Sequence, residues 1–458
     1  MGEANILVIP VWFNDSSDFI FESNKSKVKD DIQKAYFGTN QETGWRSVKT
    51  YYEEESHGAL TLNGKVADWY LHDKSYTYYR NDGNSSKTCS LVKSASDDYF
   101  DNNPGDSRTN YDKDGDGYLD SVMLIYGAPD CRSLGGGQNN LWAYCYWADD
   151  PQKDSAEPGL NVFFWASYDF MYNGSKAFER TGKTTYANGD TSHCTIDAHT
   201  YIHEMGHVFG LEDYYDYSQQ YNPAGGFSMQ DYNVGGHDPF SSYALGWGSA
   251  YIPKETTTID LKPFAETGEM ILLSPNPNSR NSPFDEYLLL EYYTPTGLNK
   301  FDCDYKYSNA YPRGPKDCGI RLWHVDARLA KFNSYDGSLT LTTNPPSRSN
   351  LVIMAMSNTY EGNGINSDSG YLSRLGSAYY DFNILQLIRN DSSATYKPDS
   401  NDNLKSDYLY KSGSSFSMSD VGGQFFNNAK LNKNIDLGFT FTVNSTNEYR
   451  ASITVTKL

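Results

Sequence analysis

The sequence contains no apolar stretch that approaches the ~20 residues of a membrane span. Its opening apolar run, residues 6–13, lacks a basic flank and a cleavage site, so it predicts a first β-strand and not a signal peptide. We therefore expect a mature or trimmed chain from which any targeting segment is absent.

Basic residues are scarce as well. The chain has 38 Lys and Arg against 58 Asp and Glu, a net charge of -20. This deficit argues against nucleic acid and anionic membranes as partners. With 39 tyrosines and many Asn, Asp, Ser and Gly residues, the composition suits an extracellular protein.

Cysteine is limited to six residues, without any CxxC spacing of the kind that zinc ribbons and redox motifs use. An even count permits three disulfides and does not require them. The most favourable pair is Cys303 with Cys318, because a loop of that length gains about 3 kcal/mol from a crosslink.

The first half of the chain alternates strand and helix patterns, as expected for an α/β domain with a mixed twisted sheet. Strands are expected at residues 6–13, around 59–71, and at 119–126, 141–147 and 162–168; helices are expected at 28–37, 47–55 and 90–100. Thr195 or Asp197 can cap a further helix that follows. We place the end of this domain at residue 248.

Beyond that point short apolar strands recur without a long helical period. They are expected at residues 257–261, 270–273, 287–292, 320–325, 338–342, 351–356, 439–443 and 451–456. This spacing predicts a β-sandwich-like domain over residues 249–458.

The most informative segment is residues 201–213, which read YIHEMGHVFGLED. On a helix, His203 and His207 project from one face, one turn apart, and can share a metal ion. Glu204 lies about 100° round the helix, where it can hold a water molecule as general base. Two imidazoles and a carboxylate in this pattern predict zinc, which supplies hydroxide near neutral pH for peptide hydrolysis.

Gly210 is placed to end this helix in a left-handed conformation and to turn the chain back toward the ion. Asp213 can then arrive as the third ligand. Glu212 is adjacent, and only one of the two acids reaches a metal easily from a tight turn; Asp216 is a further alternative.

A second motif, DKDGDGYLD at residues 112–120, sets acidic oxygens at alternate positions around glycines. This spacing can wrap a hard cation, so we expect structural Ca²⁺, although the distal glutamate of an EF-hand is missing. The candidate ligands are Asp112, Asp114, Asp116 and Asp120. The alternative is an acidic turn that leads into a strand.

Downstream of the helix motif, residues 225–231 read GGFSMQD. Met229 can form the tight methionine turn that lies below some zinc sites. Tyr232 is a candidate for a hydrogen bond in the transition state.

Several of these motifs together resemble the immune inhibitor A family of secreted bacterial zinc metallopeptidases, which are metzincin-like. The similar segments are YYEEESHG at 51–58, the acidic turn at 114–120, the helix motif, HDPFSSYALGW at 237–247, EYLLLE at 286–291 and GIRLWHVD at 319–326. The resemblance implies zinc at His203, His207 and Asp213, Glu204 as base, structural calcium, export and a zymogen prosegment.

The sequence thus predicts a secreted zinc endopeptidase, with protein or peptide substrates, built as a monomer from a zincin catalytic domain and a β-rich domain. Two alternatives remain open. One is a binding or adhesion protein on an inactive protease scaffold, which the intact helix motif disfavours. The other is a gluzincin-type aminopeptidase, whose third ligand would be a glutamate on a later helix.

Overall fold

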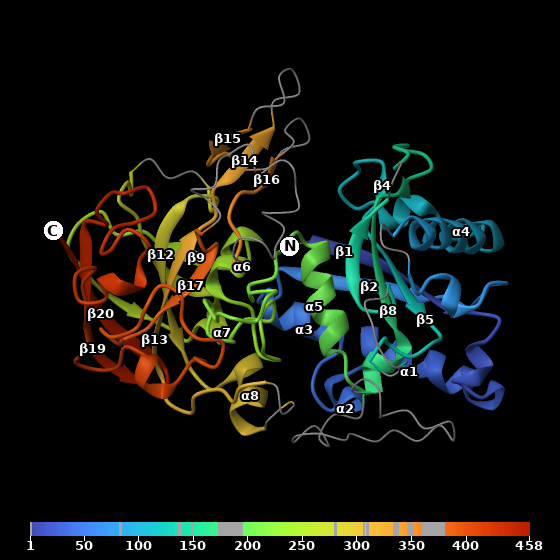
Figure 1. Cartoon of the computed structure of the whole chain (residues 1–458), viewed down its shortest axis with the longest axis horizontal. Helices are drawn as coiled ribbons and strands as arrows, with labels where there is room; N and C mark the ends of the chain where they lie inside the picture. Colours follow the sequence, from blue (N-terminus) through green and yellow to red (C-terminus); the bar gives the residue numbers. More distant parts are fainter. Residues whose placement is uncertain are drawn as a thin grey trace. The chain divides into compact units, whose positions relative to one another are not determined.

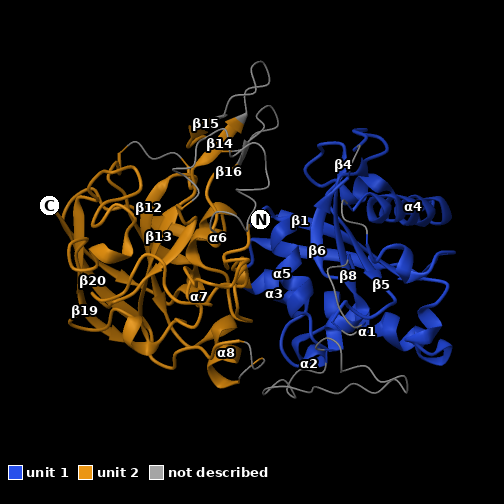
Figure 2. Cartoon of the chain, in the orientation of Figure 1, with its two compact units in different colours: residues 1–54, 58–211 blue, residues 55–57, 212–458 orange. Residues whose placement is uncertain are grey.

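The computed structural model describes residues 2–81, 85–132, 134, 140–148, 151–172, 196–278, 282–305, 307, 311–332, 339–345, 352–359 and 381–458. Packing divides the chain into two compact units (Figure 2), residues 1–54 with 58–211 and residues 55–57 with 212–458. A domain boundary at residue 248 stays a prediction, because packing units and homologous domains need not coincide.

The first unit is built on a mixed sheet with the order β2-β1-β5-β8-β6, and β3 also pairs with β1. Figure 1 labels β1, β2, β5 and β8 of this sheet. The strands are β1 (Gly2–Trp12), β2 (Leu60–Val66), β3 (Tyr70–Leu71), β5 (Val122–Tyr126), β6 (Tyr144–Trp147) and β8 (Val162–Ser167). All pairs are parallel except β6 with β8, in which Cys145 lies opposite Phe164. The central β1 and β5 are apolar and buried, as is usual for parallel strands covered on both faces.

The described helices of this unit are α1 (Lys25–Phe37), α2 (Asn40–Thr43), α3 (Val48–Glu55), α4 (Ser86–Asn102) and α5 (His199–Val208). Of these, α1, α4 and α5 contact the strands of that sheet. Leu91, Val92 and Ala95 of α4 share one core cluster with Leu7 and Leu124 of the sheet. A two-stranded pair, β4 (Tyr118–Leu119) with β7 (Gly159–Leu160), completes the unit.

The second unit contains two larger sheets. One has the order β17-β13-β12-β11-β9, with β9 (Ser249–Tyr251), β11 (Glu269–Leu273), β12 (Glu286–Tyr293), β13 (Gly319–Asp326) and β17 (Leu385–Ile388). The other has the order β10-β20-β19-β18, with β10 (Thr257–Leu261), β18 (Ser415–Phe416), β19 (Phe439–Asn447) and β20 (Arg450–Lys457). Leu288 and Leu322 of the first sheet share one buried cluster with Phe441 and Ile453 of the second.

The remaining elements of this unit are short. They are the helices α6 (Pro239–Ala244), α7 (Phe264–Thr267) and α8 (Lys300–Asp304), and the small sheet of β14 (Leu329–Phe332), β15 (Leu339–Thr342) and β16 (Val352–Met354). Within the described parts of the chain, no helix combines the length and the apolar character that crossing a membrane requires.

The structure contradicts the expected disulfide between Cys303 and Cys318, since both thiols are free. The Cys303 Sγ lies 3.1 Å from the Tyr293 hydroxyl. Cys318 instead neighbours the hydroxyl of Tyr292 and packs on the core that the two sheets share. Tyr292 and Tyr293 are consecutive residues of β12, so their side chains face opposite sides of the sheet. The two thiols beside them therefore lie apart. Cys194 lies outside the described residues.

Candidate metal centre

Helix α5 is anchored by its apolar face. Tyr201, Ile202 and Met205 are buried. The Tyr201 ring stacks on Tyr36 at 5.4 Å and meets Phe164 of β8 edge-on at 5.9 Å. With this face against the sheet, the helical period leaves His203 and His207 together on another face.

Ala198 occupies the N-cap position of α5 and makes no side-chain cap, and Asp197, one of the two expected capping residues, lies just before it. The Asp197 Oδ1 accepts a hydrogen bond of 2.9 Å from the His199 N–H, one of the amides that lack a partner within the helix. Thr195 lies outside the described residues.

The helix ends as its sequence predicts. Gly210 has φ +90°, a conformation that side-chain-bearing residues rarely adopt. Its N–H donates to the His207 carbonyl at 2.9 Å, and the Leu211 N–H donates to the Gly206 carbonyl at 3.0 Å. These bonds close the last turn and reverse the chain.

This reversal also orients a predicted ligand. The His207 Nδ1 lies 2.8 Å from the Leu211 carbonyl oxygen. A carbonyl can only accept, so Nδ1 carries the proton and donates, and Nε2 keeps its lone pair for a metal.

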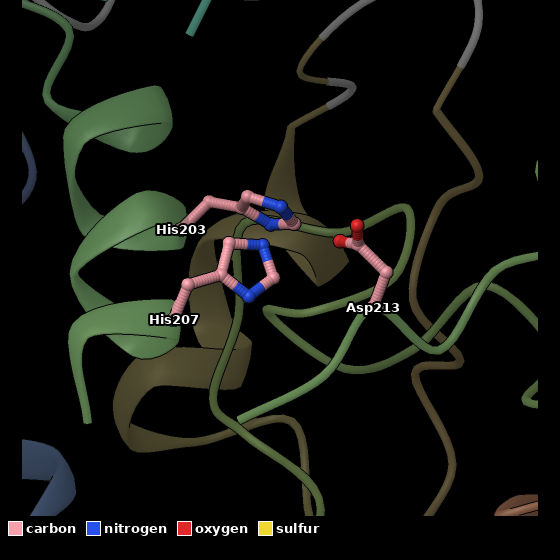
Figure 3. A group of neighbouring side chains, drawn as sticks. All are labelled: His203, His207 and Asp213. Carbon is pink, nitrogen blue, oxygen red and sulfur yellow. The ribbon is translucent and has the colours of Figure 1, made fainter. Parts of the chain in front are cut away.

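The three predicted zinc ligands come together. One ligand atom each from His203, His207 and Asp213 lies within 4.8 Å of the others, and Figure 3 shows the carboxylate facing the two rings. The imidazole centroids are 4.9 Å apart at 87°. Two neutral imidazoles and one carboxylate, gathered at this spacing, form a donor set that fits zinc with a coordination position left for water.

Hydrogen bonds distinguish Asp213 from Asp216 as the candidate for the third metal ligand. The Tyr217 hydroxyl donates to the Asp213 Oδ2 at 2.8 Å, which restrains the carboxylate. Asp216 instead turns inward and accepts the N–H groups of Gln220 and Tyr221 at 3.0 and 3.2 Å. Among the described residues, the group formed with the histidines includes Asp213 and neither Glu212 nor Asp216.

Glu204, the predicted base, is 94% buried and lies outside this ligand group. Its charge acts on two neighbours. Burial raises the pKa of the Tyr36 hydroxyl well above its ordinary value, and the charges of Tyr201 and Glu204 add to the effect. Burial, and then Glu204, likewise raise the pKa of the Cys145 thiol on β6. The carboxylate therefore lies near the antiparallel edge strand, as well as on the ligand-bearing helix.

Met229 is fully buried, and its N–H donates to the Gly236 carbonyl at 3.2 Å. Tyr232 is half-buried, with its ring 5.2 Å from that of Tyr215. Its pKa is raised to about 12, mainly by burial and further by the charges of Asp231, Asp213 and Asp216. Tyr232 thus lies within electrostatic reach of Asp213.

The acidic motif forms a tight loop. Carboxylate oxygens of Asp112, Asp114 and Asp116 lie within 4.8 Å of one another. The Asp116 N–H donates to the Asp112 Oδ1 at 2.9 Å, and Gly115 and Gly117 have φ of +67° and +89°.

Asp120, the fourth predicted ligand of this motif, lies outside that group among the described residues. Its carboxylate accepts the Lys113 N–H at 3.0 Å. Its pKa is raised to about 6, by burial first and then by the charges of Asp114, Asp112 and Asp116.

Neither Tyr217 nor the Leu211 carbonyl could be predicted from the sequence. One tyrosine among 39 is not conspicuous, and a backbone carbonyl has no sequence signature. Both act through a turn whose path only the fold defines.

Comparison with known proteins assigns the chain to a family of peptidases. Residues 6–232 match the immune inhibitor A peptidase M6 catalytic domain, and the chain belongs to this family. The matched region starts in β1 and reaches Tyr232, so it includes the helix motif, Asp213 and Met229.

Among curated proteins the chain is similar to the pre-pro-metalloprotease PrtV of Vibrio cholerae serotype O1, strains M66-2 and El Tor Inaba N16961. The identity is 26% over 248 residues, which cover 46% of this chain and 24% of that protein. The chain thus matches about a quarter of the length of these relatives.

Proposed function

We propose that this chain is a secreted zinc-dependent endopeptidase. The observation that carries the proposal is the convergence of His203, His207 and Asp213 beside the buried Glu204. Membership of the immune inhibitor A family supports the same class of reaction.

His203, His207 and Asp213 would hold the ion. When bound there, zinc lowers the pKa of water and polarises a peptide carbonyl. Glu204 accepts the proton of the attacking water and delivers it to the leaving amine. Its burial keeps competing water away from this transfer, and the hydrogen bond from His207 to Leu211 keeps the imidazole in the ligating tautomer. We assign to Tyr232 the hydrogen bond that stabilises the developing oxyanion.

We further propose Ca²⁺ as a structural ion at Asp112, Asp114 and Asp116, with Asp120 beside them. Three converging carboxylates repel one another unless a cation neutralises them. The pKa of Asp120 is raised first by its burial and then by the charges of these three carboxylates.

For the domains, we propose a zincin catalytic domain over residues 1–248 and a β-sandwich-like domain over 249–458. The first strand of the five-stranded sheet begins at Ser249, and the shared core of the two larger sheets is what a sandwich requires. We expect the protein to be exported, in line with the name pre-pro-metalloprotease of its relative. We also expect it to act as a monomer.

The test compares the parent chain with Glu204→Ala for zinc content and for cleavage of casein and of a peptide with blocked termini. We expect both proteins to hold about one zinc ion, and only the parent to hydrolyse either substrate. Glu212→Gln is a matched control, because it changes a carboxylate next to the third ligand and should retain both properties; Asp213→Asn should weaken zinc binding.

The outcomes separate the alternatives. A parent that cannot hold zinc when zinc is supplied would favour the inactive binding scaffold. Cleavage limited to peptides with a free amino terminus would favour the aminopeptidase.

A further inference from the structure

The segment after the ligand-bearing region, residues 227–238, is irregular and almost completely buried. We call it the methionine segment; every residue in it except Tyr232 and Gly236 is buried. Irregular backbone in a core cannot satisfy its amides through a helix or a sheet, so other groups must accept those hydrogen bonds. Two buried carboxylates from distant parts of the chain do so.

The first carboxylate is Asp302 on α8, which is 98% buried. The Val234 N–H lies 3.4 Å from its Oδ1 and 3.3 Å from its Oδ2, and the Gly235 N–H donates to it as well. A methyl group on Gly235 would come within 3.2 Å of the Asp302 Oδ2, so the glycine allows the close approach.

The second carboxylate is Glu55 at the end of α3, which is 95% buried. Its Oε2 accepts the His237 N–H at 3.2 Å, and its Oε1 accepts the Ser242 hydroxyl at 2.9 Å. A methyl group on Gly236 would lie 3.0 Å from the Glu55 Oε2, so the backbone also passes very close to this carboxylate.

The two carboxylates accept the amides of residues 234, 235 and 237, and the remaining residue of this stretch, Gly236, bonds back to Met229. The Gly236 carbonyl accepts the Met229 N–H at 3.2 Å. Because of this bond, a shift of residues 234–237 would also move Met229. It would move Tyr232 as well, since Tyr232 lies in the same loop.

We propose that Asp302 and Glu55 are positioning residues for the active site: by fixing the amides of residues 234–237, they set where Met229 and Tyr232 lie. The proposal rests on the proposed peptidase function. It also gives α8 and the end of α3, which carry no predicted catalytic group, a defined part in that function.

The variants follow from the hydrogen-bond geometry. In Asp302→Asn, either orientation of the amide puts an NH₂ near the Val234 N–H, so two donors face each other. In Glu55→Gln, the carbonyl can accept from His237 while the NH₂ donates to the Ser242 oxygen, so the contact survives. Glu55→Ala removes it.

Glu286→Gln is the matched control. Glu286 is a buried carboxylate of the same unit that accepts the Asn432 and Lys433 N–H groups and a 2.9 Å bond from the His324 Nε2, and among the hydrogen bonds that the structure describes it has none to the methionine segment. Its amide also faces donors on both sides, so it reproduces the local damage of Asp302→Asn elsewhere.

Each variant is measured for kcat, KM and zinc content, and for amide hydrogen exchange of peptides that cover residues 228–238. We expect Asp302→Asn and Glu55→Ala to retain zinc, to exchange faster in that segment and to lose about 10- to 100-fold in kcat. Glu55→Gln should recover most of what Glu55→Ala loses, and Glu286→Gln should keep its kcat.

Parental kcat in Asp302→Asn, or an equal loss in Glu286→Gln, would overturn the proposal. If Asp302→Asn does not fold, Gly236→Ala replaces it, since its methyl group crowds the Glu55 Oε2; unchanged kcat and exchange there would overturn the proposal. If the parent shows no peptidase activity, the proposed function fails by itself, and the exchange data still decide whether the carboxylates hold the segment.

Discussion

Replacing Glu55 by glutamine should make the protein more stable, relative to the parent, as the pH rises. Burial raises the pKa of this carboxyl from 4.5 to about 8; the hydrogen bonds from Ser242 and His237 oppose the shift, and the charges of Asp238 and Glu291 add to it. In the unfolded chain the same carboxyl ionises near 4.5.

This difference in pKa determines how the contribution of Glu55 to stability changes with pH. A folded-state pKa above the unfolded value gives stability that is complete below pH 4.5 and is lost as the pH rises toward 8. Within that window the unfolded state has released a proton that the folded state retains, so the free energy of unfolding falls by about 1.4 kcal/mol per pH unit. Between pH 5 and pH 7 the parent should therefore lose about 2.7 kcal/mol that the glutamine variant keeps.

The assay is urea unfolding of both proteins at pH 5, 6 and 7, with metal chelated, followed by tryptophan fluorescence and extrapolated linearly to water. Only the difference between the proteins is used, because Asp302, whose burial raises its pKa to about 7, titrates in both. A difference that stays constant over this range would refute the reasoning, because Glu55 would then be ionised in the folded protein despite its burial.

Three further predictions concern other groups. Tyr217→Phe should weaken zinc binding about 10-fold, because Asp213 loses a hydrogen bond that orients it; titration with Co²⁺ followed by its visible spectrum measures this without an activity assay, and equal affinity would show that the bond is unimportant. Calcium should raise the melting temperature of the parent and leave that of Asp114→Asn nearly unchanged; a scan with and without EDTA tests both, and an equal shift would place the ion elsewhere. Arg321→Ala should cost about 3–5 kcal/mol in unfolding free energy, since it leaves Glu291 buried without its ion-pair partner; a loss below about 1 kcal/mol would contradict this.

The sequence predicted the parts of the fold that are determined locally. Each of the eight strands expected after residue 248 has a counterpart in β10, β11, β12, β13, β15, β16, β19 and β20. The metal-site helix and its glycine end were equally accessible, because the spacing of His203, His207 and Gly210 is a property of one helical turn. The short strands β9, β14, β17 and β18 were missed, since two to four residues carry little periodicity.

Groups that act through distant partners could not be predicted in this way. Glu55 accepts an amide that lies 182 residues away in the sequence, and Asp302 accepts one 68 residues away. The predicted disulfide between Cys303 and Cys318 was wrong for a related reason. Their separation along the chain defines the length of the loop. The face of the sheet on which each thiol lies depends instead on the register of β12. The Cys303 thiol lies beside Tyr293 and the Cys318 thiol beside Tyr292, and these two tyrosines face opposite sides of the sheet.

Two buried carboxylates lie in segments that, on sequence alone, resemble the immune inhibitor A family outside the helix motif. Glu55 belongs to the similar segment at 51–58, and Glu286 to the segment at 286–291. Both are buried, and each accepts backbone amides of an irregular segment, at His237 for Glu55 and at Asn432 and Lys433 for Glu286. An apolar core position tolerates many side chains of similar volume, whereas a buried amide outside a helix or a sheet needs an acceptor at one place. Segments that supply such acceptors are therefore more constrained in sequence than the apolar strands around them.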